Sequence, residues 1–335
     1  MDIPINIQVY KAYRIVRDML DQRGYDVSSY PPLSLEQLQL KKNADDQVNA
    51  CPVIPIVVSK QATASTPFDD NSCEMKELQT FRKTQLLSTG FQKRYPTLYS
   101  LFTSNTNDFS DSQLHSLYNL YKTFAKPITE VHFDQCFNPV NLWGANSKDV
   151  RFTNQMLAII EALESTGQLK ARELLNLQDD NKMSKADTLQ LDNQQKEDLI
   201  TELVTVFKKA RTLVFLYPTR NKASITLDSK YEGHCNEIMS KHGVFIQLFN
   251  VCKLMFNVTE HEIVPKHEAL DPWQNKDEID EIKQVYNMKN IAKNNPIIPL
   301  NDPVAKFIGL RRGQLCKITR TNNTSGTFVT YRYCK

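Results

Sequence analysis

Glycine is scarce in this chain, and the glycine-rich motifs that bind phosphates or dinucleotides are missing. Only nine of the 335 residues are glycine, and no stretch has the pattern of a P-loop, a nucleophile elbow or a dinucleotide-binding turn. The cysteines also lack the C-x-x-C spacing of many zinc and redox sites. These absences argue against most classes of enzyme, and we expect no cofactor and no bound metal.

Long apolar runs and a targeting signal are missing as well. No run approaches the roughly 20 apolar residues that cross a bilayer, and the start Met1-Asp2-Ile3-Pro4 lacks the basic and then apolar layout of a signal peptide. An odd number of cysteines suits reduced, buried thiols better than a disulfide framework. They are Cys51, Cys73, Cys136, Cys235, Cys252, Cys316 and Cys334. We therefore expect an intracellular protein that has no membrane partner.

The apolar content is high enough for one large core or two modest ones. Hydrophobic residues make up 41% of the chain, and a length of 335 residues favours two or more domains. The net charge is +3, and it is unevenly placed, since residues 261–335 contain 12 basic and 8 acidic residues. A solvated surface explains this excess about as well as a phosphate contact does.

Local sequence signals are most consistent near the C-terminus. Asp302 and Pro303 form a helix start, and Gly309 supplies the left-handed residue that ends a helix of about two turns. The apolar face of this helix consists of Val304, Phe307 and Ile308. After a basic turn at residues 311–313, a β-hairpin is predicted with strands at 314–320 and 327–333.

The residues upstream complete a small α+β module. Residues 258–267 are predicted to be extended, with a strand at 260–264 that closes at Pro265. Residues 275–288 are predicted to form a helix that has acidic residues near its N-terminus. Its expected apolar face consists of Ile279, Ile282, Val285 and Tyr286.

These C-terminal residues resemble the fifth subunit of eukaryotic nuclear RNA polymerases and its archaeal counterpart. The resemblance is carried by residues 257–267 (NVTEHEIVPKH) and 302–309 (DPVAKFIG), followed in the same order by Arg312-Gly313-Gln314, Lys317-Ile318-Thr319-Arg320 and Thr330-Tyr331-Arg332. A helix over residues 9–20 followed by Arg23-Gly24-Tyr25 also resembles the start of the eukaryotic subunit.

The resemblance implies an architecture and a set of contacts. In this family the C-terminal module docks on the largest polymerase subunit, and the N-terminal domain forms a jaw that is similar to the restriction-endonuclease fold. We therefore expect an α/β jaw domain with a mixed sheet at residues 1–258, enlarged by insertions within about 61–193, and an α+β assembly domain at 259–335. The implied interface residues are Glu260, His261, Glu262, Val264, Pro265, His267, Asp302, Pro303, Arg311, Arg312, Gln314, Arg320, Tyr331 and Arg332.

The rest of the chain follows an α/β pattern. A helix at 196–210 leads directly into an apolar strand at 212–217, and a further strand is predicted at 244–249. Residues 52–59 form an apolar run that Pro55 makes irregular or an edge strand. Within the insertion we predict helices at 76–87, 112–124 and 156–163, a strand at 130–137, and a loop at 182–193. A short helix is predicted at 34–38.

The loop after the strand at 212–217 is the candidate DNA contact. It contains Thr219, Arg220, Asn221, Lys222 and Ser224, whose charges and donors suit phosphate oxygens without reading bases. The resemblance places the corresponding loop nearest to downstream duplex DNA. A solvated polar turn is the alternative interpretation.

Three other kinds of chemistry fit parts of the chain less well. His261 and His267 lack the spacing of a zincin motif. The arginines and aromatic residues of the C-terminal hairpin could form a single-strand-binding sheet, but a protein interface fits them better. Residues 225–230, if they form a strand, would place Asp228 and Lys230 as the acid-x-Lys pair of a metal-dependent nuclease.

The sequence thus favours a non-catalytic subunit of a multisubunit DNA-directed RNA polymerase, with the largest subunit, other polymerase subunits and downstream DNA as partners. The alternatives are a transient polymerase-binding adaptor and the nuclease. We expect the protein in the nucleus of a eukaryote, or in a cytoplasmic factory or virion if a large DNA virus encodes it. The role of the insertion stays open.

Overall fold

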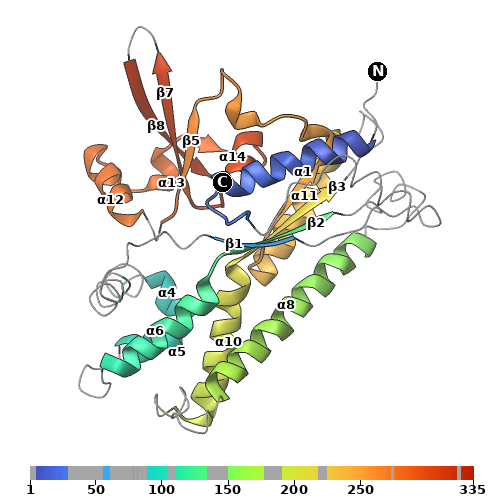
Figure 1. Cartoon of the computed structure of the whole chain (residues 1–335). Helices are drawn as coiled ribbons and strands as arrows, with labels where there is room; N and C mark the ends of the chain where they lie inside the picture. The colour runs from blue at the N-terminus through green and yellow to red at the C-terminus, as the bar shows by residue number, and fades with distance from the viewer. Residues whose placement is uncertain are drawn as a thin grey trace, which may run out of the picture.

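The computed structural model contains two β-sheets, one in each half of a two-part molecule (Figure 1). It describes residues 5–28, 56–60, 78, 81, 89–103, 111–133, 150–176, 191–217, 225–272, 275–322 and 326–335. The helix predicted at 34–38, most of that predicted at 76–87 and most of the loop predicted at 182–193 lie outside these residues. No helix in the described part of the chain has the length and apolar character needed to cross a membrane.

The first sheet is mixed, as the sequence predicted. Its order is β1-β2-β3-β4, formed by β1 (Ile56–Ser59), β2 (Ile128–Phe133), β3 (Arg211–Tyr217) and β4 (Phe245–Asn250). The last three are parallel, whereas β1 pairs antiparallel with β2 at the edge. An edge position suits the proline that precedes β1, since proline cannot donate to a ladder.

Strands β3 and β4 form the centre of the first core. Every residue of both strands is buried, which explains their nearly continuous apolar sequences. Helix α10 (Asn193–Lys209) leads into β3, and it starts at a capping box in which Asp192 and Gln195 bond each other's backbone N–H groups. The predicted helix-to-strand unit at 196–217 is confirmed.

One face of this sheet is covered by a layer of helices that comes largely from the predicted insertion (Figure 1). The layer contains α4 (Thr89–Arg94), α5 (Pro96–Thr103), α6 (Asp111–Ala125), α8 (Val150–Asn176), α10 and α11 (Ile225–His242). Helix α6 confirms the prediction at 112–124, whereas α8 is much longer than the helix predicted at 156–163. The small residue Gly167 lets α8 approach α10, since a Cβ there would lie 3.2 Å from the Phe207 ring.

Helix α1 (Ile5–Gln22) covers the opposite face of the sheet (Figure 1). Val16, Met19 and Leu20 are buried there in one cluster with Val214 and Leu216 of β3. The helix ends at Gln22, and Gly24 just beyond it has a left-handed φ of 79°. This confirms the first predicted helix and gives the sheet helices on both faces.

The second sheet belongs to the C-terminal part and has the order β5-β7-β8-β6. Its strands are β5 (Lys266–Leu270), β6 (Ile297–Ile298), β7 (Leu315–Asn322) and β8 (Gly326–Cys334). Strands β7 and β8 form the predicted hairpin. Around them lie α12 (Lys276–Val285), α13 (Ile291–Asn294), α14 (Pro303–Ile308) and two 3-10 turns, η3 (Val251–Lys253) and η4 (Val258–Glu260).

Helix α12 is shorter than predicted, and its apolar face is only half buried. Ile279 and Ile282 pack against Leu270 and Leu315. In contrast, Val285 and Tyr286, which the sequence places on the same helical face, are 70% and 53% exposed. The helix ends at Val285.

Helix α14 joins the two parts of the molecule through Arg23. Asp302 accepts the backbone N–H groups of Val304 and Ala305 at 2.9 and 3.1 Å, as the sequence predicted. At the other end, Arg23 donates to the carbonyl oxygens of Lys306 at 2.6 Å and Phe307 at 2.9 Å. These carbonyls lie at the negative end of the helix dipole, and the Lys306 carbonyl also accepts the Gly309 N–H at 3.1 Å.

Gly309 makes this contact possible for two reasons. Its φ of 71° is left-handed, and a Cβ at this position would lie 3.1 Å from the Arg23 guanidinium. Burial lowers the pKa of Arg23 to about 10, so the group stays charged at neutral pH.

Glu202 of α10 caps a neighbouring helix, and its replacement is expected to destabilise the helical layer. Its two carboxylate oxygens accept the N–H groups of Thr97 at 2.8 Å and Leu98 at 2.7 Å, at the start of α5. We expect Glu202→Ala to lower the free energy of unfolding by about 1.5–3 kcal/mol, the range for hydrogen bonds to charged groups. Urea unfolding measures this, with the exposed Glu197→Ala on the same helix as control. Equal effects of the two changes would contradict the capping role.

Arg23→Met is expected to loosen the junction between the two parts. It leaves the Phe307 carbonyl without its donor, whereas Lys306 keeps the bond from Gln247 at 3.0 Å. We expect a loss of about 1–3 kcal/mol in urea unfolding and faster hydrogen exchange at the Gly309 and Leu310 amides. Arg14→Met, on an exposed position of α1, is the control. Unchanged hydrogen exchange at these amides in the Arg23 variant would refute the role of Arg23 at this junction.

Candidate functional site

The predicted DNA-contact loop lies outside the described residues. Thr219, Arg220, Asn221, Lys222 and Ser224 follow the last residue of β3, Tyr217, and precede α11. The carboxyl ends of β2, β3 and β4 lie at the same edge of the sheet, because the three strands are parallel and in register. The candidate DNA contact stays a prediction.

Residues 225–230 form the first turns of helix α11, so their interpretation as a strand was wrong. The physical reason is topological, because β3 and β4 are parallel neighbours and parallel strands need a crossover connection, usually a helix. Asp228 and Lys230 therefore do not form the acid-x-Lys pair of a nuclease strand.

The prediction of a strand at 260–264 is also wrong, because Asn257 folds this segment into turns. Its side-chain oxygen accepts from the N–H of Thr259 at 3.0 Å and the hydroxyl at 2.6 Å, and its amide donates to Glu260 at 2.9 Å. A second turn follows, in which Val264 donates to the His261 carbonyl at 2.8 Å. Asparagine commonly competes with regular structure in this way.

This turn segment contains five of the residues that the resemblance implied as interface, and three of them are exposed. Glu260, His261 and Glu262 are exposed, and Val264 and Pro265 are half-buried. Between them Ile263 is 84% exposed, and Phe256 just before the turn is 59% exposed. Strand β5 begins only after Pro265, where the His267 ring hydrogen-bonds the Pro265 carbonyl at 2.6 Å.

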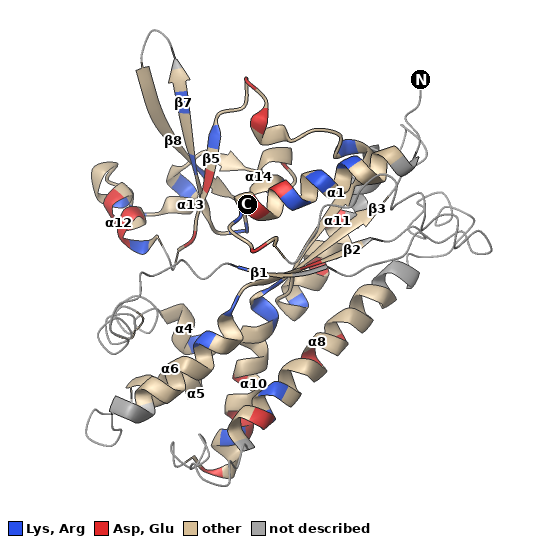
Figure 2. Cartoon of the chain, in the orientation of Figure 1, with Lys and Arg blue, Asp and Glu red and all other residues tan. Residues whose placement is uncertain are grey.

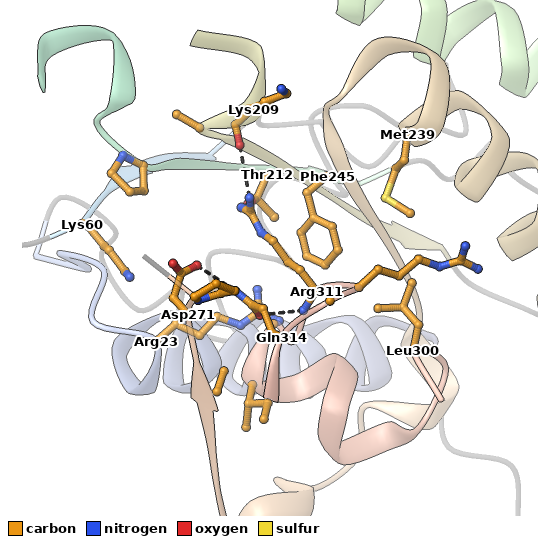
Figure 3. Close-up of a pocket in the computed structure, with 18 of the residues that line it drawn as sticks. Arg23, Lys60, Lys209, Thr212, Met239, Phe245, Asp271, Leu300, Arg311 and Gln314 are labelled. Atoms are coloured by element: carbon orange, nitrogen blue, oxygen red, sulfur yellow. Dashed lines mark hydrogen bonds between the residues drawn. The ribbon is translucent and has the colours of Figure 1, made fainter. Parts of the chain in front are cut away.

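Two implied interface residues instead make contacts within the chain (Figure 3). Arg311 donates to the Lys209 carbonyl at 3.2 Å and to the Thr212 hydroxyl at 3.1 Å, and it lies over the Phe245 ring at 4.8 Å. Gln314 accepts from the Arg311 N–H at 2.8 Å and donates to Asp271 at 2.9 Å. Burial lowers the pKa of Arg311. Arg311 thus ties the C-terminal part to the first sheet, whereas Gln314 holds the turn that carries Arg311 against Asp271 within the C-terminal part.

The remaining implied residues differ in their surroundings. The Asp302 side chain is engaged at the start of α14, and Pro303 beside it is exposed. Arg312 and Arg320 are exposed, whereas Arg332 is half-buried. Tyr331 lies 6.1 Å from the Tyr286 ring, and burial raises its pKa. These residues come from the start of α14, the basic turn and the hairpin, so they belong to different elements of the C-terminal part.

The described cysteines behave as small hydrophobic residues. Cys235, Cys316 and Cys334 are free and buried, and Cys252 is free and half-buried. Burial raises the pKa of Cys235 and of Cys316 to about 12, which keeps these thiols protonated and unreactive. Within the described ranges no group of three or more His, Cys, Asp or Glu side chains could hold a metal ion.

Comparison with known proteins agrees with the C-terminal resemblance. Residues 256–334 match the family of the RNA polymerase Rpb5 C-terminal domain. A relative from Dictyostelium discoideum, named DNA-directed RNA polymerases I, II, and III subunit rpabc1, is 39% identical over 98 residues, which cover 29% of this chain and 47% of the relative. The subunits of the same name from Caenorhabditis briggsae and Caenorhabditis elegans are each 40% identical over 87 residues, 26% of this chain and 38% of the relative.

The matches thus span less than half the length of these relatives. They confirm the resemblance that the residues at 257–267 and 302–309 carried. Residues 256–334 of this chain are thus similar to the C-terminal domain of Rpb5, a subunit of the nuclear RNA polymerases.

Proposed function

We propose that this chain is a non-catalytic subunit of a multisubunit DNA-directed RNA polymerase, and that its C-terminal domain, residues 259–335, docks on the largest subunit. The match of residues 256–334 to the Rpb5 C-terminal domain supports this most strongly. The relatives are eukaryotic polymerase subunits, which favours the nucleus as the place of action. Other polymerase subunits are further partners under this proposal.

The distribution of exposed apolar side chains supports docking through this domain. Seven large hydrophobic residues are exposed among those described, and six of them lie within residues 256–334. They are Phe256, Ile263, Val285, Tyr286, Ile297 and Phe328. Exposed apolar groups gathered in one domain are typical of a protein–protein interface.

The turn at residues 257–264 provides the best anchor on this surface. Ile263 is the most exposed of the six residues, at 84%. The turn that carries it is fixed on both sides by the Asn257 bonds and by the Val264-to-His261 bond. A pre-ordered turn loses little conformational entropy on binding, so an apolar side chain on it can contribute strongly to affinity.

We further propose that residues 1–258 form the jaw domain, with a restriction-endonuclease-like sheet, beside downstream duplex DNA. The mixed sheet with helices on both faces supports an α/β domain of this kind. The basic loop at 219–224 follows the carboxyl end of a central parallel strand, where open α/β sheets present ligand sites. Its contacts would be to the phosphate backbone.

Ile263→Asp is expected to weaken the association with polymerase. A charge at an apolar anchor must be desolvated on docking, so we expect a loss of about 2 kcal/mol or more, roughly thirtyfold in affinity. The measurement is quantitative co-purification of the tagged full-length chain with the largest subunit, at matched expression.

Leu169→Asp is the matched control, because Leu169 is 62% exposed on α8, outside the C-terminal domain. It should leave the yield of polymerase unchanged. If Ile263→Asp recovers as much of the largest subunit as the unmodified chain does, the docking proposal is contradicted. Substoichiometric, salt-labile recovery of the unmodified chain would indicate a transient adaptor instead.

Replacing both Arg220 and Lys222 with alanine is expected to reduce the salt dependence of DNA binding. Each phosphate contact contributes about 0.9 to the slope of log K against log salt, so losing two lowers the slope by about 1.8. The measurement is a salt titration of polymerase binding to a downstream duplex. The control replaces the exposed Lys11 and Lys289 with alanine. An unchanged slope in the loop variant would remove the DNA contact.

A further inference from the structure

A large cleft lies between the two parts of the molecule (Figure 3). Its volume is about 1510 Å³, more than the roughly 300–1,000 Å³ of most small-molecule sites. One wall comes from α4, the end of α10 and the segment after β1, and the other from β5, α14 and the basic turn at residues 311–313. A ligand in this cleft would contact both parts at once.

Positive charge is concentrated in this cleft. Its lining contains seven Lys and Arg residues against three Asp and Glu residues, an excess of four. The whole chain has a net charge of only +3, so the rest of the surface is close to neutral. Figure 2 shows basic positions around α4, the end of α10 that leads into β3, and β1, all bordering the junction.

Four Lys and Arg side chains in the lining of the cleft have no carboxylate partner among the described residues. Lys60, Arg94, Lys209 and Arg312 line it and form no salt bridge with any described residue. Elsewhere the pattern is different, since Lys208 pairs with Glu164, Lys306 with Glu232, and Lys317 with Glu278. Of the described Lys and Arg residues in the lining, only Lys266 forms a salt bridge, with Glu268 at 2.5 Å.

Lys209 shows the electrostatic effect of this arrangement. Its ammonium donates to the Tyr95 hydroxyl at 3.0 Å and lies 4.9 Å from the centre of that ring, but it has no counter-charge among the described residues. Burial, together with the nearby charges of Arg94 and Lys208, lowers the pKa of Lys209 to about 8. An anion in the cleft would offset both effects and stabilise the charged form.

The lining favours an acidic polypeptide over nucleic acid. Five of the six Phe and Tyr rings in the described lining are less than 9% exposed, and the sixth, Tyr121, is half-buried. The five are Tyr25, Phe91, Tyr95, Phe245 and Phe307. The lining therefore has no row of exposed rings of the kind on which single-stranded nucleic acids stack.

Strand β5 adds a positive reason for a polypeptide. It is an edge strand of its sheet, and residues 266–269 of it line the cleft. An edge strand offers backbone donors and acceptors that an extended peptide can use. A peptide with acidic side chains would combine such bonds with charge pairing to Lys60, Arg94 and Arg312.

We propose that this interdomain cleft binds an acidic, extended segment of a partner polypeptide, held between the cations of both walls and the edge strand β5. This site borders the proposed docking surface, since Val264 and Pro265 line the cleft, but Ile263 itself does not. Its test uses the full-length chain alone, so its outcome is independent of the proposed polymerase role.

The test measures the binding of a short, fluorescently labelled peptide of alternating glutamate and serine by anisotropy. The triple variant Lys60→Gln, Arg94→Gln and Arg312→Gln is expected to bind at least roughly tenfold more weakly, because three favourable charge contacts are removed. Binding to the unmodified chain should also weaken steeply with added salt. Protection of the β5 amides from hydrogen exchange on peptide binding is the second expected result.

The matched control is Lys11→Gln, Lys289→Gln and Lys293→Gln, which removes the same charge from exposed positions outside the cleft. It should keep the affinity of the unmodified chain for the peptide. Equal loss in both triple variants would overturn the site, as would absent protection of β5. Tighter binding of a single-stranded oligothymidylate, competing with the peptide, would overturn the choice of polypeptide.

Discussion

The molecule depends on a half-buried guanidinium that connects its first helix to its last one. Arg23 follows α1 and donates to two carbonyl oxygens at the end of α14. A buried charge is tolerated only when its donors are satisfied, and the helix terminus satisfies them with the negative end of its dipole. Gly309 suits this contact because its φ is left-handed and because a Cβ there would lie only 3.1 Å from the guanidinium.

Directional polar contacts of this kind set the orientation of the two parts. Arg311 bonds the end of α10 and the start of β3, and Gln314 connects the same turn to Asp271. Apolar burial adds affinity without direction, whereas hydrogen bonds fix angles. Phe307 supplies the apolar part, since it packs into the core between α1 and the sheet. The docking domain and the jaw proposed here would therefore move as one unit at this junction.

The sequence predicted elements whose causes are local and failed where the causes are distant. The start and end of α14 follow from Asp302, Pro303 and Gly309, and the hairpin from its alternation. In contrast, a strand was predicted at 260–264 because Pro265 disfavours helix in the residue before it, whereas the Asn257 side chain folds the start of this segment into a turn. The prediction for residues 225–230 was wrong because only the parallel pairing of β3 and β4 requires a helix there.

The candidate site shows the same division. The exposed turn at 260–264 was identified from the resemblance, although its predicted conformation was wrong. The inward contacts of Arg311 and Gln314 could not be predicted, because their partners Lys209, Thr212 and Asp271 lie far away in sequence. The positive charge of the cleft could not be predicted from the sequence either, since residues such as Lys60, Arg94 and Arg312 are far apart along the chain.

The bond from Arg23 to Phe307 spans 284 residues, which has a consequence for biosynthesis. Helix α1 leaves the ribosome long before α14 is synthesised. The apolar face of α1 therefore cannot pack against α14 until translation is nearly finished. Contacts of such high sequence separation slow folding and leave early segments open to chaperones or proteases. A nascent chain that ends before Lys306 would lack both carbonyl partners of Arg23.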